Sequence, residues 1–322
     1  MRWFLALTLI CGEALAQEPP AWFAESLFFV REDAAEAAKE GKRVMLYFGQ
    51  DGCPYCKQLM EVNFRQARIV EKMRKSFVAI ALNIWGDREI TWTDGRVMSE
   101  KQLSAALKLQ FTPTLLFLDD QGKVVLRVNG YLPPDRFEAA LDYVSGKMEA
   151  TMAFADFRSS AQPASAKLHE QPFFMKPPYD LRRKPGAKPL AVLFETPLCA
   201  GCDELHREAF KRKEVLSRLP QFDVVRVSSL SSETLVAPGG QQLKASEWAS
   251  RLKLSYVPSM LFFDDRGREV FRIEAYLRPF HLAGSLEYVA SGAYRSEPSF
   301  QRFLQAEAER SRARGETVDL WN

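Results

Sequence analysis

The sequence has little net charge, few cysteines and no long apolar run. A formal net charge of +3 over 322 residues offers no strong field to attract nucleic acid or an anionic membrane. Hydrophobic residues at 47% and charged residues at 26% are typical of a globular chain, not of a disordered one. The length suits two domains. We therefore expect no nucleic-acid partner and no membrane-spanning segment.

The most apolar stretch lies at the N-terminus, where residues 3–11 are too few to span a bilayer. Arg2 precedes this stretch and Ala14-Leu15-Ala16 follows it as an A-x-A cleavage site, which together are typical of an export signal. We predict a signal peptide over residues 1–16, a mature chain from Gln17 and a periplasmic location. The alternative is an ordinary N-terminal helix.

The chain has only five cysteines, too few and too locally placed for a disulfide framework. Cys11 lies in the predicted signal, and the other four form two C-x-x-C pairs, Cys53/Cys56 and Cys199/Cys202. A disulfide across two residues closes a very small loop and restrains the unfolded chain little. Redox chemistry therefore explains the pairs better than stabilisation does.

The two halves of the chain repeat each other at an offset of 145 to 146 residues. Phe111–Gly122 returns as Tyr256–Gly267, and Cys53 returns as Cys199. Two copies do not make a solenoid, so each copy must bury its own core.

Apolar runs, capping residues and turn signals predict the order α-β-α-β-α-β-β-α for a copy. In the first copy we expect helices over 33–40, 55–62, 99–107 and 136–144, and strands over 44–48, 77–84, 115–118 and 124–128. The predicted fold class is α/β, with two domains that each have a mixed central sheet and helices on both faces. The expected boundaries are 17–148 for the first domain, 149–186 for a linker, 187–295 for the second domain and 296–322 for a polar helix and tail.

These motifs together resemble the thioredoxin superfamily. The strand Val44–Phe48 leads into Cys53-Pro54-Tyr55-Cys56, and Pro113 and Pro258 follow the first cysteine of their copies by 60 and 59 residues. The first copy most resembles the exported SoxW-like thioredoxins linked to bacterial sulfur oxidation. The resemblance implies that both prolines are cis and lie against the dithiols.

A thiolate, not a thiol, carries out disulfide exchange. Cys53 and Cys199 begin helices, whose free N–H groups favour an anion, so we predict that they are the nucleophiles. Cys56 and Cys202 are the predicted resolving thiols.

The resemblance also implies that the backbone before each proline faces the substrate and pairs with an extended peptide. Alternatively, each proline is an ordinary strand-entry residue. The residues predicted to contact substrate are Pro54, Tyr55, Thr112, Pro113, Val257 and Pro258.

The two sites differ in charge. Lys57 follows the first pair, whereas Asp203 and Glu204 follow the second. Negative charge near a thiol disfavours its thiolate, so we predict a lower pKa for Cys53 than for Cys199. His206 could ligate a metal or move a proton, but a half-exposed surface position is the more common role of such a histidine.

One family feature is missing. Thioredoxins carry a buried aspartate six residues before the first cysteine, where this chain has Tyr47 and Leu193. Glu195, four residues before Cys199, is an uncertain substitute on the loop side. A thioredoxin-like proton relay is therefore in doubt at both sites.

The sequence predicts a periplasmic thiol–disulfide oxidoreductase that needs no cofactor beyond its redox-active disulfides. Its expected partners are exported protein or small-molecule disulfides and thiols, and a membrane electron donor or acceptor. The direction of electron flow is open, with a reductase favoured over an oxidase or isomerase.

Two other functions stay open. Four cysteines in two pairs could hold structural zinc, but Cys56 and Cys199 are 143 residues apart, whereas such sites expect roughly 15 to 20. We therefore predict no metal site. The other alternative is a binding or chaperone module with one redox-active domain and one docking domain, the second being the docking candidate.

Overall fold

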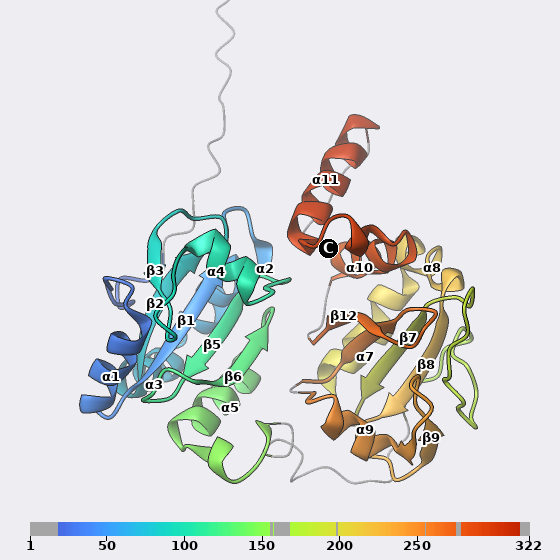
Figure 1. Ribbon diagram of the computed structural model, residues 1–322, viewed down its shortest axis with the longest axis horizontal. Coiled ribbons are helices and arrows are strands. Elements are labelled where there is room, and N and C mark those ends of the chain that lie inside the picture. Colours follow the sequence, from blue (N-terminus) through green and yellow to red (C-terminus); the bar gives the residue numbers. More distant parts are fainter. Residues whose placement is uncertain are drawn as a thin grey trace, which may run out of the picture.

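The computed structural model describes residues 19–154, 157, 168–197, 199–254, 256–274 and 278–315. The predicted signal peptide lies outside these residues. The described chain forms two α/β domains that lie beside each other (Figure 1). None of the helices in the described ranges combines the length and apolar character that a bilayer crossing needs.

The first domain is built on a four-stranded mixed sheet with the order β2-β1-β5-β6. Strand β1 is parallel to β2 and antiparallel to β5, and β5 and β6 form an antiparallel hairpin. Its elements are α1 (Val30–Lys39), β1 (Arg43–Gly49), α2 (Pro54–Gln58), the π-helical η1 (Leu59–Asn63), α3 (Ala67–Ser76), β2 (Phe77–Asn83), β3 (Glu89–Thr91), β4 (Val97–Ser99), α4 (Glu100–Ala106), β5 (Thr114–Leu118), β6 (Val124–Asn129), α5 (Pro134–Ser145) and the 3-10 turn η2 (Met148–Ala150).

Strand β1 is buried on both faces because helices cover both sides of the sheet. Met45 and Tyr47 point into one core with side chains of α2, α3 and α5, whereas Val44, Leu46 and Phe48 point into another with α1 and α4. This alternation follows from the two-residue period of a strand. The sequence predicted this arrangement. Ser99 caps α4 as expected, and the structure adds a capping box with Gln102.

The second domain repeats the sheet with the order β12-β11-β7-β8. Its elements are β7 (Leu190–Glu195), α7 (Ala200–Arg207), η3 (Ala209–Lys211), α8 (Lys213–Leu216), η4 (Leu219–Gln221), β8 (Asp223–Ser228), β9 (Thr234–Val236), β10 (Gln242–Lys244), α9 (Ala245–Arg251), β11 (Ser259–Phe263), β12 (Glu269–Ile273), α10 (Pro279–Ala290), η5 (Ala293–Arg295) and α11 (Phe300–Ala313).

The second domain has no helix before its first strand among the described residues, unlike the first domain. The chain there holds the cis Pro177–Pro178 bond, and proline lacks the N–H that a helix interior needs. Within the predicted linker, Phe174 and Leu181 are instead buried in the two cores of the second domain.

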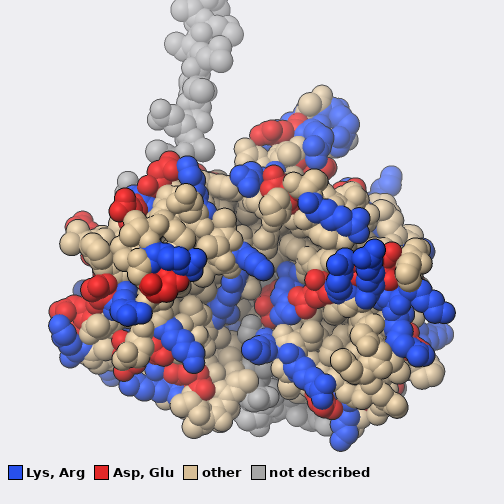
Figure 2. Space-filling model, in the orientation of Figure 1, with Lys and Arg blue, Asp and Glu red and all other residues tan. Residues whose placement is uncertain are grey.

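The C-terminal helix α11 packs more deeply than its polar sequence suggested. We expected a polar helix and tail here, and the structure adds that Phe300, Phe303 and Leu304 are buried in the second core. Residues three and four apart share one face of a helix, so this apolar face packs inward while the charged residues remain outside. Positive and negative side chains are interspersed over the surface, which is hollowed between the domains (Figure 2).

Candidate redox sites

The first C-x-x-C pair forms a disulfide at the start of α2. Cys53 is the N-cap residue, and its Sγ accepts a hydrogen bond from the Cys56 backbone N–H at 3.0 Å. Pro54 occupies the first turn, where the missing N–H costs nothing because helix starts leave their N–H groups unpaired. The local sequence thus directs the Cys56 backbone N–H at the Cys53 sulfur.

The second pair repeats this geometry at the start of α7. Cys199 and Cys202 form a disulfide, and Cys199 Sγ accepts from the Cys202 N–H at 3.1 Å. Only 1% of Cys199 is exposed, compared with 6% of Cys53. Both first cysteines are therefore closed off in this arrangement of the domains.

The residue before each predicted proline lies near a disulfide, since Thr112 lines a cavity together with Cys53 and Val257 contacts Cys199. The Thr112–Pro113 and Val257–Pro258 bonds are both cis. Cys199 Sγ lies 3.6 Å from Val257 O. The predicted residues thus gather into two sites, one around each disulfide.

A small cavity beside the first disulfide is lined by residues of both domains. Cys53, Tyr55 and Thr112 come from the first domain, whereas His281 of α10 and Gln301 of α11 come from the second. The first site is therefore bounded by the other domain, which no sequence motif indicated.

The domains meet through equivalent residues of the two repeats. Phe111, before the first cis-proline, contacts Phe271 and Phe300 in the core of the second domain, with ring centroids 5.8 and 5.6 Å apart. Tyr256, its counterpart 145 residues on, is buried in the core of the first domain. The residue two before each cis-proline is thus buried in the core of the opposite domain.

His281 lies over the first site. Its ring stands 5.1 Å from the Tyr55 ring, and the Tyr55 hydroxyl accepts from the Arg278 N–H. Its Nδ1 is buried with no hydrogen-bond partner in the described structure. Burial, and then the nearby Arg278 charge, lower the pKa of His281 to about 4. His281 is therefore neutral at neutral pH.

The depressed pKa of His281 predicts a loss of stability in acid. An unfolded histidine titrates near pH 6.5, so between about pH 6.5 and 4 the unfolded state binds the additional proton. Stability is complete above this window and falls as the pH drops through it, by about 2 kcal/mol at pH 5. Denaturant midpoints from pH 7 to 4.5 should show this fall in the wild type and a smaller one in His281→Gln. Equal falls in both proteins would remove His281 as the cause.

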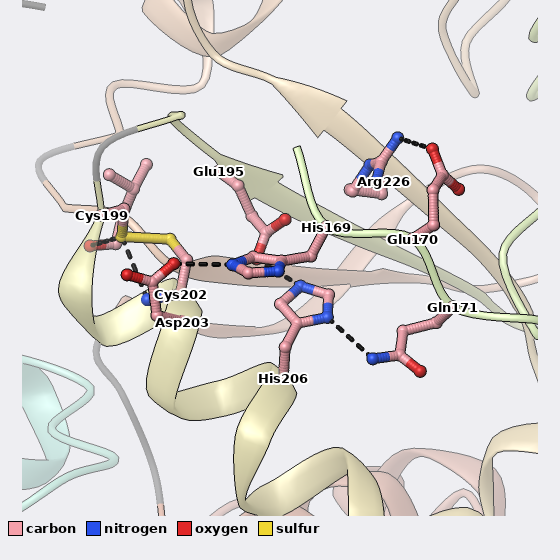
Figure 3. A network of polar contacts seen from close by, with 10 residues as sticks. His169, Glu170, Gln171, Glu195, Cys199, Cys202, Asp203, His206 and Arg226 are labelled. Atoms are coloured by element: carbon pink, nitrogen blue, oxygen red, sulfur yellow. Dashed lines mark hydrogen bonds and ion pairs between the residues drawn. A yellow bond between two sulfur atoms is a disulfide. The ribbon is translucent and has the colours of Figure 1, made fainter. Parts of the chain in front are cut away.

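A buried polar network lies behind the second disulfide (Figure 3). His206 Nε2 and Glu195 Oε1 are 2.8 Å apart, with 4% and 1% of the two side chains exposed. Gln171 contacts His206 Nδ1 at 3.1 Å. The expectation of a half-exposed His206 is therefore wrong, because segment 168–174 folds over α7 and covers it.

His169 continues this network toward the surface. Its ring stacks on His206 at 4.6 Å, and its Nε2 lies 2.6 Å from Asp203 Oδ1 (Figure 3). Asp203, the negative charge next to Cys202 in the sequence, thus has a partner from outside α7.

Both domains have a buried polar group at the position of Gly49 and Glu195, at the end of the strand that precedes each disulfide. A Cβ on Gly49 would lie 2.3 Å from Tyr47 Oη, so the phenol fills the space beside that glycine. In the second domain Leu193 replaces Tyr47 and Glu195 replaces Gly49. Burial raises the pKa of the Tyr47 phenol above its ordinary value. The second site thus has a buried carboxyl where the first has a buried phenol.

The sequence did not indicate Arg136, His281 or Gln301 as site residues. Arg136 Nη2 lies 3.9 Å from Cys199 Sγ, and Gln301 donates to Gln110 O at 2.8 Å. The available signal was weak: Arg136 and His281 occupy equivalent places, 145 residues apart. Within the described ranges, no three His, Cys, Asp or Glu side chains are grouped to hold a metal ion.

The fold and the paired sites define a class of protein in which a strand leads into a C-x-x-C disulfide facing a cis-proline. The model of the thioredoxin-like domain matches residues 30–145 and 182–290. This match covers more than half of the chain, in two copies, so the chain belongs to the thioredoxin-like domain family.

Individual relatives are distant. The thiol:disulfide interchange protein DsbD of Photorhabdus laumondii is 30% identical over 105 residues, which is 32% of this chain and 16% of that protein. The chain thus spans about a sixth of that relative. A thioredoxin-fold protein from Helicobacter pylori is 22% identical, with a TM-score of 0.35 and coverage of 42% of this chain and 84% of its own. The oxidised C-terminal domain of Neisseria meningitidis DsbD is 19% identical, with a TM-score of 0.29 and coverage of 38% and 99%.

Proposed function

We propose that this protein is a thiol–disulfide oxidoreductase with one reacting pair in each domain. The observation that carries the proposal is the twofold occurrence of one arrangement: a disulfide at a helix start, with the first sulfur accepting a hydrogen bond from the backbone N–H of the second cysteine. Cys53 and Cys199 are the nucleophiles of this proposal, and Cys56 and Cys202 the resolving thiols. No bound cofactor is needed, because the sulfur pairs themselves carry the electrons.

In the reducing direction, the Cys53 thiolate attacks one sulfur of a partner disulfide. The partner S–S bond breaks, a mixed disulfide forms, and the leaving partner thiolate takes a proton. The Cys56 thiolate then attacks the Cys53 sulfur and releases the second partner thiolate. The partner disulfide gains two electrons and two protons, and the dithiol becomes a disulfide. The oxidising direction reverses each step.

The proposal places the protein in the periplasm after removal of residues 1–16. Its partners there are exported protein or small-molecule disulfides and thiols, with electrons exchanged through a membrane electron donor or acceptor. The similarity to part of a protein named as a thiol:disulfide interchange protein supports this class of partner. A SoxW-like role for the first domain, and the reducing direction, belong to the same proposal.

The test is to equilibrate the protein in graded redox buffers and quantify each pair by differential alkylation and mass spectrometry. Both pairs should titrate reversibly. A value near roughly −270 mV at Cys53/Cys56 indicates a thioredoxin-like reductant, and one near roughly −120 to −180 mV indicates a disulfide donor or isomerase.

The same titration separates the proposed enzyme from the docking alternative. If only Cys53/Cys56 titrates, the second domain is the docking module, and serine at Cys199 and Cys202 should leave turnover intact. If neither pair exchanges electrons with the buffer, the oxidoreductase proposal is wrong.

A further inference from the structure

Arg136 of the first domain reaches the reacting sulfur of the second. It lies on α5, where its Nη2 is 3.9 Å from Cys199 Sγ and its Nη1 donates to Val257 O at 3.0 Å. The guanidinium also lies 5.3 Å from the centre of the Tyr256 ring. Three contacts across the domain boundary therefore fix this cation beside the disulfide.

The other charged groups around the second site are paired or exposed. Asp203 on α7 contacts His169, and Glu204 on the same helix is exposed. Glu195 at the end of β7 is bonded to His206. The Arg136 guanidinium is a cationic group in contact with a reacting sulfur. A guanidinium keeps its charge at every physiological pH.

The first site differs at the position equivalent to Arg136. The residue equivalent to Arg136 is His281, which is held neutral and whose ring lies 5.1 Å from the Tyr55 ring in a tilted arrangement. At the place of Tyr55 the second site has Gly201, where an added Cβ would already stand 3.2 Å from Pro258. An aromatic side chain there would compete for the space beside the cis-proline, so Gly201 keeps that space free of a side chain.

We infer that Arg136 is a catalytic residue of the second site and that its guanidinium is the counter-ion of the Cys199 thiolate. This inference rests on the proposed function, because the thiolate that Arg136 stabilises is the proposed nucleophile. A positive charge at this distance lowers the pKa of an acid. Cys199 is then the more acidic of the two nucleophiles. The residues next to each pair in the sequence predicted the opposite order of the two thiol pKa values, because Arg136 is not among them.

Arg136 also affects the redox equilibrium of the Cys199/Cys202 pair. Stabilising a thiolate favours the reduced form of the pair, so Arg136 makes Cys199/Cys202 a stronger oxidant. The same guanidinium donates a hydrogen bond to Val257 O, which is the acceptor that an extended peptide would need. A protein partner must therefore displace Arg136, and the second site is complete as a thiolate site only while the domains are in contact.

The inference is tested by titrating the ultraviolet absorbance of the thiolate in a full chain whose only thiol is Cys199, with serine at the other four cysteines. Arg136→Gln should reduce the thiolate fraction roughly tenfold at pH values below the Cys199 pKa. Arg136→Lys should restore part of it, because a lysine keeps the charge but not the forked contact. Arg68→Gln is the matched control: it removes an exposed arginine of α3 that pairs with Glu138 of α5, the helix that carries Arg136, and should change nothing.

An unchanged Cys199 titration in Arg136→Gln overturns the inference. Equal effects of Arg136→Gln and Arg68→Gln would also overturn it, because net charge would then be the cause. Unfolding curves of each variant separate a local effect from a loss of the fold. If Arg136→Gln does not fold, the Cys199 titration of Arg136→Lys still tests the inference. The titration needs no exchange activity. A chain without exchange but with an Arg136-dependent titration would refute the proposed function alone.

Discussion

Replacing Phe111 by alanine is expected to cost about 3 to 5 kcal/mol of stability and to open both redox sites. The Phe111 ring is 6% exposed and packs in the core of the opposite domain. Its removal leaves a cavity where the first cis-proline loop enters the second domain. Because the opposite domain bounds both sites, the loosened contact should speed reduction of both disulfides by a protein reductant. Unfolding curves and the rate of disulfide reduction measure the two effects.

Phe77→Ala is the matched control for Phe111→Ala. Phe77 is also a buried phenylalanine of the first domain, but its ring packs on Phe117 within that domain, 5.5 Å away. It should cause a similar loss of stability without the faster reduction. If both variants speed reduction equally, global unfolding explains the effect, and the domain contact does not guard the sites.

Replacing Glu195 by alanine is expected to destabilise the second domain by about 3 kcal/mol. The substitution leaves His206 buried without its 2.8 Å partner, and a buried polar group that loses its partner bears the cost of desolvation. Glu195→Gln keeps a hydrogen-bonding side chain of nearly the same shape and should cost less. Urea unfolding followed by tryptophan fluorescence reports the loss, because Trp248 is buried in the same domain.

Asp203→Ala tests whether this cost depends on burial. Asp203 and His169 belong to the same network, but 51% and 47% of their side chains are exposed, so the loss should be below about 1 kcal/mol. The double variant Glu195→Ala/His206→Ala should cost less than the sum of the single variants if the pair is coupled. Additive losses would mean that the Glu195–His206 contact contributes little.

Local patterns made the fold predictable. Val44–Phe48 is a buried strand because its apolar run fits a sheet covered on both faces, and Cys53 caps a helix because Pro54 starts one. The repeat then assigned the same structure to the second copy. The prediction was weaker for α11, where Phe300 and Phe303 are separated by polar residues and only a helical arrangement places them together.

The site was predictable only in part. The sequence identified Cys53 and Cys199 with the prolines that follow them, because strand, turn and helix are set by neighbours along the chain. It did not identify His281, which reaches the first site from α10, more than 200 residues after Cys53. It also placed His206 at the surface, because the segment that covers it arrives from before the domain.

The sequence by itself thus determined two thioredoxin-like domains, each with a disulfide at a helix start and a proline loop beside it, since these features depend on short-range pattern and internal repetition. Only the tertiary structure decided the environment of each sulfur. Electrostatic and packing contacts act through space, so the charge beside Cys199 comes from Arg136 in the other domain and the ring over Tyr55 from His281. The docking of the two repeats therefore makes two similar motifs into two chemically different sites.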